Sequence, residues 1–226
     1  MDHTQASRRI GRIAALALFF CGVAYAIVTV IGVISLKSPL DPIRDPFFSL
    51  MEILIIIMGP LLVVLMVAVH AYAARDEKVY SLTALAFMIL SAGTTTSIHF
   101  VVLIASRQAA LTSLPWLPLF LSFQWPSVVY ILDVLAWDVF YGFSMLFAAP
   151  VFKGGKWETA VRITMAVIGV LSIVGLICLP FGNIQLRWIG IFGYAGLSPV
   201  VFLLLAKVLG RTESRSQETA RVLVLS

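Results

Sequence analysis

The sequence predicts an all-α, polytopic membrane protein, a bundle of six transmembrane helices with both termini cytoplasmic. Three observations lead to this fold class. The chain of 226 residues is 61% hydrophobic and only 12% charged, whereas soluble domains are about 25% charged. Its mean hydropathy is +1.02. Its apolar stretches are long and continuous, and most of its lysines and arginines gather at the ends of these stretches.

Six apolar stretches are long enough to cross a bilayer, whose core of about 30 Å needs about twenty helical residues. A helix suits lipid because it satisfies its backbone polar groups within one segment. We expect spans at Ile13–Leu36, Phe48–Ala74, Tyr80–Ser106, Ser127–Phe152, Ala160–Pro180 and Trp188–Leu209.

The first stretch imitates a cleavable signal peptide, because it follows the basic segment Ser7–Arg12 and contains Ala24-Tyr25-Ala26. Its apolar run continues to Leu36, which exceeds the about 7–15 residues of a signal-peptide core. We therefore expect an uncleaved first helix. The second and sixth stretches contain Pro60 and Pro199, and each proline removes one helical hydrogen bond and predicts a kink.

The positive charges predict the orientation. With six spans, only Lys37, Arg44, Arg107 and Arg187 fall on the side opposite the N-terminus, and the other lysines and arginines fall on the N-terminal side. Because positive charge favours the cytoplasmic side, we expect both termini there. Residues 1–210 form the transmembrane domain and residues 211–226 a short polar cytoplasmic tail. Charges at helix ends, rather than on one soluble face, argue against nucleic acid as a partner.

The connections differ in length between the two sides. The short loops Arg75–Lys78 and Lys153–Glu158 predict that the helices they join are antiparallel neighbours. The longest connection, Arg107–Pro126, contains three prolines and several aromatic residues. Since tryptophan prefers the headgroup level, we expect an interfacial or partly re-entrant lid, with a simple aromatic membrane anchor as the alternative.

Ionisable residues within the spans mark the candidate site, because a charge near the bilayer centre costs about 2.5–3.5 kcal/mol. At a rise of 1.5 Å per residue, Glu52, His99 and Asp133 lie at similar depths in the outer half, and Asp138 lies nearer the centre. Helical spacing places further polar and aromatic side chains on the same faces. The candidate pocket residues are His99, Asp133, Asp138, Glu52, Thr95, Tyr130, Trp137 and, at the outer boundary, Arg107.

The two aspartates are expected to diverge. Five residues along one α-helix amount to about 140° at 100° per residue, so Asp133 and Asp138 should not both point into one narrow site. We expect Asp133 to pair with His99, and Asp138 to meet a different helix, with the polar segment Asn183–Arg187 as one candidate, or to lack a clear partner. In the alternative interpretation, His99 and Asp133 form a buried pair that only fixes helix packing.

The pattern predicts no particular reaction. His70 and His99 lie in opposite halves of the membrane, whereas two histidines that ligate one haem need the same depth. The sequence also lacks H-x-x-x-H spacing for zinc and a glycine-rich phosphate loop. We predict no metal site, leave the cofactor unknown and do not favour an enzyme.

The function we expect is a polar pocket in the outer half that binds or carries a small or amphiphilic ligand. A non-catalytic accessory or assembly subunit of a larger membrane complex is the alternative. An intramembrane enzyme that uses the pair His99 and Asp133 is the third hypothesis. The expected partners are membrane lipid, a hydrophobic or amphiphilic ligand, and other membrane subunits.

Three segments of the chain resemble a known group of proteins. Together with the helix layout, Arg8–Phe19, Tyr141–Pro150 and Ile189–Tyr194 are similar to uncharacterised six-helix inner-membrane proteins of bacteria, which are grouped as domains of unknown function. The resemblance covers most of the chain. It implies a multi-pass protein of the bacterial inner membrane, and it brings no activity and no site residues.

Overall fold

The computed structural model describes residues 3–38, 41–105, 107, 108, 111, 114–181 and 187–225. Within these ranges every regular element is helical. Six helical stretches are long and apolar enough to cross a membrane, namely Gln5–Ile34, Phe47–Tyr72, Arg75–Ala105, Val128–Val151, Lys156–Gly175 and Trp188–Arg211. The chain is a multi-pass transmembrane protein, as its composition predicted.

The first three spans are continuous helices. They are α1 (His3–Ile34), α2 (Phe47–Tyr72) and α3 (Lys78–Ala105), with the 3-10 turn η1 (Arg75–Glu77) leading into α3. The helix α1 begins ten residues before the expected Ile13, because the basic and polar residues that precede the apolar run continue the helix. α2 runs through Pro60 as one helix.

The fourth and sixth spans are divided into segments of different helical geometry. The fourth consists of α6 (Val128–Val134), the π-helical η2 (Leu135–Tyr141), α7 (Gly142–Ala148) and the 3-10 segment η3 (Ala149–Val151). The fifth is α8 (Lys156–Gly175), which η4 (Leu176–Phe181) follows. The sixth consists of α9 (Trp188–Ile191), the π-helical η6 (Phe192–Gly196) and α10 (Ser198–Leu225).

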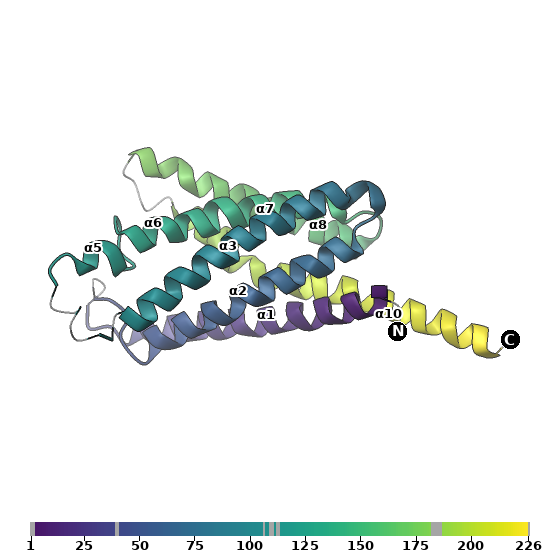
Figure 1. Cartoon of the computed structure of the whole chain (residues 1–226), viewed down its shortest axis with the longest axis horizontal. Helices are drawn as coiled ribbons and strands as arrows, with labels where there is room; N and C mark the ends of the chain where they lie inside the picture. The colour runs from purple at the N-terminus through teal and green to yellow at the C-terminus, as the bar shows by residue number, and fades with distance from the viewer. Residues whose placement is uncertain are drawn as a thin grey trace.

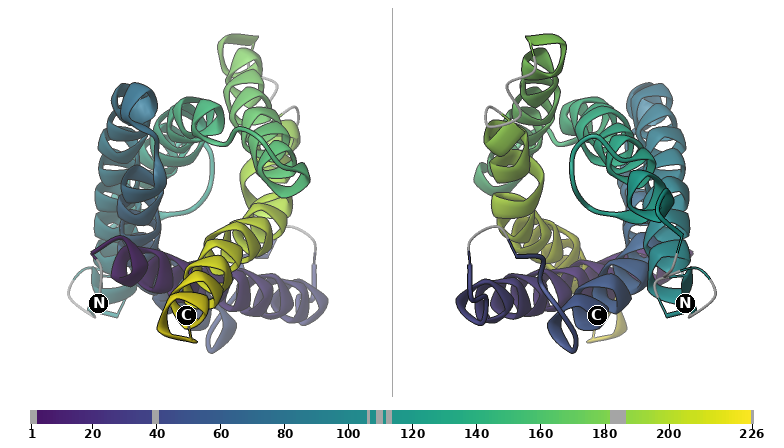
Figure 2. Two further views of the ribbon diagram at one scale, coloured as in Figure 1. Left: turned by 90° about the vertical axis from the view of Figure 1, so that its right-hand side faces the viewer. Right: turned by 90° about the vertical axis from the view of Figure 1, so that its left-hand side faces the viewer.

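The spans form an elongated bundle (Figure 1). α1 begins and α10 ends at one end, which we call the terminal end, and the short helix α5 (Leu117–Leu121) lies at the opposite end, the lid end. α1 contacts α2 and α10, α2 contacts α3, and α7 contacts α3 and α8. Figure 2 shows α1 and α8 on opposite sides of the bundle.

One continuous apolar core joins the six spans. It includes Leu18 of α1, Met66 of α2, Met88 of α3, Ile168 of α8 and Leu205 of α10. Large apolar side chains also cover the outside of the bundle, where Phe20 is 65% and Ile163 56% exposed. Such a surface suits lipid rather than water, so the helices bury one apolar face against each other and present another to the membrane.

Candidate functional site

Five ionisable side chains meet in the lid-end half of the bundle, and we call them the charged network. They come from four different spans or their ends: Glu52 from α2, His99 from α3, Asp133 from α6, Asp138 from η2 and Arg187 directly before α9. Glu52, His99, Asp138 and Arg187 are each at most 4% exposed, and the Asp133 side chain is 15% exposed.

His99 lies between two carboxylates. Its Nδ1 donates a hydrogen bond of 2.8 Å to Oε2 of Glu52, and its Nε2 lies 3.5 Å from Oδ1 of Asp133. The structure therefore brings together the three groups that the sequence placed at one depth. Ion-pair distances on both sides of the ring suit an imidazole that carries a proton on each nitrogen.

Arg187 lies between the two aspartates. Its Nη2 is 3.8 Å from Oδ2 of Asp133 and 3.4 Å from Oδ2 of Asp138. The guanidinium carbon lies 4.5 Å from the centre of the Tyr130 ring, which is a cation–π distance. Nη2 also approaches the hydroxyl of Tyr194 at 3.3 Å. From the sequence, Arg187 was expected at the membrane boundary and was not among the candidate pocket residues.

As expected, Asp133 contacts His99 and Asp138 meets a different helix at Arg187, but the expectation that the two aspartates do not point into one site is wrong. Both contact the same guanidinium, because the fourth span changes from α-helix to π-helix in η2. In a π-helix the hydrogen bonds run from residue i to residue i+5, so residues five apart, such as Asp133 and Asp138, return toward one face. The wider turn also changes carbonyl pairing, and Ser91 of α3 donates to the carbonyl of Ala136 at 2.8 Å.

Asp138 fits into the bundle because glycine lies opposite it. A Cβ atom on Gly190 would lie 2.4 Å from Oδ1 of Asp138, and a Cβ on Gly175 would lie 3.1 Å from it. Any larger side chain at Gly190 would displace the carboxylate. Oδ1 itself is buried and makes no hydrogen bond among the described residues. The carboxylate thus has one partnered oxygen and one free oxygen.

Aromatic and hydroxyl side chains surround the charged network. Trp137 donates from its indole nitrogen to Oγ1 of Thr95 at 3.1 Å, and its ring stacks on Tyr194 at 5.5 Å. Tyr194 belongs to η6, the second π-helical segment. The predicted residues Thr95, Tyr130 and Trp137 therefore lie beside the charged network, Tyr130 and Trp137 on the side of Arg187.

Arg107 does not join the charged network, although the sequence analysis included it among the pocket candidates. It lies at the surface of the lid end, with its side chain 49% exposed, and pairs with Asp45 at 3.3 Å. It also donates to the hydroxyl of Ser49. Hydrogen bonds from Ser49 lower the pKa of Asp45 below its ordinary value. Arg107 therefore stabilises an exposed cluster above the buried site.

The long connection expected to form a lid covers His99. Phe123 stacks on the His99 ring at a centroid distance of 4.9 Å and an angle of 20°. Phe123 and Leu121 pack with residues of α2, α3 and α6 in a small second apolar cluster. On the other surface of the same segment Trp116 is 51% exposed. The segment thus separates the imidazole from the lid-end surface.

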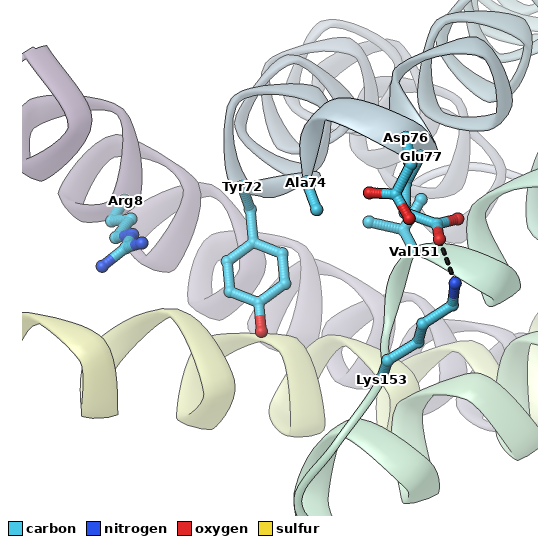
Figure 3. Close-up of a pocket in the computed structure, with 7 residues that line it drawn as sticks. All are labelled: Arg8, Tyr72, Ala74, Asp76, Glu77, Val151 and Lys153. Atoms are coloured by element: carbon cyan, nitrogen blue, oxygen red, sulfur yellow. Dashed lines mark hydrogen bonds and ion pairs between the residues drawn. The ribbon is translucent and has the colours of Figure 1, made fainter.

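The side chains of the charged network are buried rather than exposed in an open cleft. A polar cavity lies at the terminal end, where Arg8, Tyr72 and Lys153 are among its lining residues (Figure 3). Within the described ranges, no three His, Cys, Asp or Glu side chains are arranged to hold a metal ion. The acidic and basic side chains of the network can exchange protons and bind a charged group.

Comparison with protein families, with curated proteins and with solved structures gives no match to this chain. The functional argument therefore rests on the geometry of the charged network and its surroundings.

Proposed function

We propose that the protein binds or carries a small or amphiphilic ligand that has a positive charge, and that the charged network is its site. The observation that supports this is the charge count. Glu52, Asp133 and Asp138 face one guanidinium and one imidazole, so with all three carboxylates ionised even a protonated His99 leaves one negative charge in excess. A buried charge without a partner costs several kcal/mol, and a bound cation would offset that cost.

Free polar atoms in the network offer contact points for such a ligand. Oδ1 of Asp138 is buried without a hydrogen bond among the described residues. Nε2 of His99 and Oδ1 of Asp133 also lack one, but they face each other at 3.5 Å, so the acceptors for a cation are the aspartate oxygens. The two π-helical segments at the same depth add support, because such segments are frequent at functional sites.

Access to the network would involve the lid segment. Phe123 covers His99, while Trp116 and Phe120 of the same segment are exposed and suit the headgroup level of a membrane. An amphiphilic cation would enter from this level once Phe123 moves aside, and its charge would lie at the carboxylate of Asp133. The same proposal places the terminal end in the cytoplasm, on the basis of the positive charges, and the protein in the inner membrane of a bacterium.

Native mass spectrometry of the protein purified in detergent tests this proposal, with tetraphenylphosphonium as an added amphiphilic cation. We expect either a co-purified adduct or saturable binding of the probe to the unchanged protein. Asp133→Asn removes one carboxylate that contacts both His99 and Arg187, so it should reduce binding at least tenfold.

The control is His70→Gln. His70 is also a histidine within a span, but it hydrogen-bonds Ser81 near the terminal end at 2.8 Å. This variant should bind the probe as the unchanged protein does. Equal binding by Asp133→Asn and His70→Gln, or no saturable binding by any form, would contradict the proposal.

A non-catalytic subunit of a larger membrane complex is the second candidate function. Gly93 on the outside of α3 favours it, because a Cβ there would meet no atom within 4 Å, and small residues on a lipid-facing helix let another helix approach closely. Co-purification of a second membrane protein in constant ratio, lost in Gly93→Leu, would favour this role. Catalysis by His99 and Asp133 is the third hypothesis, and no described contact supplies a nucleophile for it.

A further inference from the structure

An open cavity of about 330 Å³ lies at the terminal end (Figure 3), whereas the charged network lies in the lid-end half of the bundle. This volume falls in the range of small-molecule sites, about 300–1,000 Å³. The cavity lies where α1, α2, η1 and the end of the fourth span meet. Its lining residues are Arg8, Tyr72, Ala74, Asp76, Glu77, Val151 and Lys153.

The lining carries two positive and two negative side chains. Lys153 forms an ion pair with Glu77, and this carboxylate raises the pKa of the lysine above its ordinary value. Glu77 is only 4% exposed, so its buried carboxylate holds the Lys153 ammonium at one position in the lining. These two charges compensate each other, which leaves Arg8 and Asp76 as the charges available to a ligand.

Arg8 and Asp76 lie on different sides of the cavity, with the Tyr72 ring between them (Figure 3). The guanidinium carbon of Arg8 is 5.9 Å from the centre of that ring. The Nε atom of Arg8 is buried and has no hydrogen-bond partner among the described residues. Asp76 is exposed, in the first turn before α3. The cavity therefore offers a cation on one side and a carboxylate on the other.

The position of the cavity matches the surface of the bilayer. α2 ends at Tyr72 and the fourth span ends at Val151, so two lining residues mark the limit of their spans. Directly inside this level, Ile10 and Ile13 of α1 and Val79 and Leu82 of α3 are exposed apolar residues. A molecule in the cavity would thus have its polar part among charges and its apolar part beside lipid-facing helices.

We propose that this cavity binds a phosphoethanolamine headgroup, with its phosphate at Arg8 and its ammonium at Asp76. Arginine recognises phosphate oxygens through several N–H donors. A primary ammonium donates hydrogen bonds to a carboxylate, which a quaternary choline group does not do. An anionic headgroup without an amine could place its phosphate at Arg8 but would leave Asp76 without an ammonium partner.

Native mass spectrometry with defined lipids tests the inference on the full chain in detergent. Phosphatidylethanolamine, phosphatidylcholine and phosphatidylglycerol with the same acyl chains are added in turn. We expect the ethanolamine lipid to bind at least tenfold more tightly than the other two. Arg8→Gln and Asp76→Asn should each remove this preference.

Two matched controls separate the cavity from general surface charge. Arg9→Gln removes an exposed arginine next to Arg8, and Asp41→Asn removes a carboxylate at the lid end, so both should keep the preference. Arg8→Lys retains the positive charge and should keep binding within a few-fold, which guards against a variant that merely fails to fold.

Several results would overturn the inference. They are equal binding of the three lipids, or an unchanged preference in folded Arg8→Gln or Asp76→Asn. Free phosphoethanolamine distinguishes the source of the headgroup. If it displaces the lipid at a concentration similar to that of the lipid, the chemistry stands and the ligand is soluble. If it does not, the acyl chains contribute and the ligand is the lipid.

Discussion

Replacing Arg187 by methionine should destabilise the protein strongly, because Arg187 is the cation that both aspartates share. Methionine keeps much of the length of the side chain and removes the charge. Asp138 is fully buried and lies 3.4 Å from the guanidinium, and Asp133 lies 3.8 Å from it. The change would leave Asp138 with no other positive partner among its described contacts.

Removing one partner of a buried ion pair costs about 3–5 kcal/mol. Both contacts are at the long end of the ion-pair range, and a carboxyl group can bind a proton to limit the cost. We therefore expect a loss near the lower limit, about 3 kcal/mol. At about 2–4 °C per kcal/mol for a chain of this size, the melting temperature should fall by about 6–12 °C.

Thermal unfolding in one detergent, followed by tryptophan fluorescence, measures this change, because Trp137 stacks on Tyr194 next to the site. Arg107→Met is the matched control. Arg107 is an exposed arginine in an ion pair at the same end, and its loss should cost at most about 1 kcal/mol.

The double variant Arg187→Met, Asp138→Asn tests the cause. If the cost comes from an uncompensated carboxylate, Asp138→Asn should recover at least half of the lost stability in the Arg187→Met background. A melting temperature of Arg187→Met equal to that of Arg107→Met, or strictly additive effects in the double variant, would refute the reasoning.

Three further predictions concern single positions. Gly190→Ala places a Cβ 2.4 Å from Oδ1 of Asp138 and should cost about 1–3 kcal/mol, whereas Gly93→Ala, with open space around its Cβ, should not lower the melting temperature. Trp137→Phe removes the hydrogen-bond donor to Thr95 and should lower the stability by about 0.5–1.5 kcal/mol in the same thermal assay. The double variant Trp137→Phe, Thr95→Val should be no less stable than Trp137→Phe alone. A further loss of stability in the double variant would contradict this role of the hydrogen bond. The pKa of Asp45 lies below its ordinary value because Ser49 donates to it, so the stabilising effect of the carboxylate is present above about pH 4 and is lost as the pH falls through the folded-state pKa. Asp45→Asn should therefore lower the stability by less than about 1 kcal/mol at neutral pH and should equal the unchanged protein in acid. A destabilisation by Asp45→Asn that grows as the pH falls would contradict this prediction.

The sequence predicts the number of spans well because an apolar run of about twenty residues has the length and composition of a transmembrane helix. The predicted Phe48–Ala74 and the observed Phe47–Tyr72 differ by one and two residues. The larger difference at the start of α1 has a simple reason. Hydropathy identifies the part of a helix that lies in lipid, and helical hydrogen bonding continues into the basic segment before Ile13.

The depth of Glu52, His99 and Asp133 could also be predicted, since it needs only the helical rise and the ends of the spans. The register at Asp138 could not. A π-helical segment depends on contacts between helices, such as Ser91 with the carbonyl of Ala136, and leaves no local mark in the sequence. Arg187 was left out of the candidate pocket for the same reason, because Asp138 contacts its guanidinium only when η2 is a π-helix.

The position of His99 gives the charged network an electrical asymmetry. His99 lies six residues before the end of α3, or about 9 Å at 1.5 Å per residue, which is about a third of a 30 Å core. One elementary charge that crosses the whole membrane gains or loses about 2.3 kcal/mol per 100 mV. A cation that enters from the lid end as far as His99 would therefore sense about 0.8 kcal/mol per 100 mV. Occupancy of the site would change with membrane voltage even if no ion crossed to the other side.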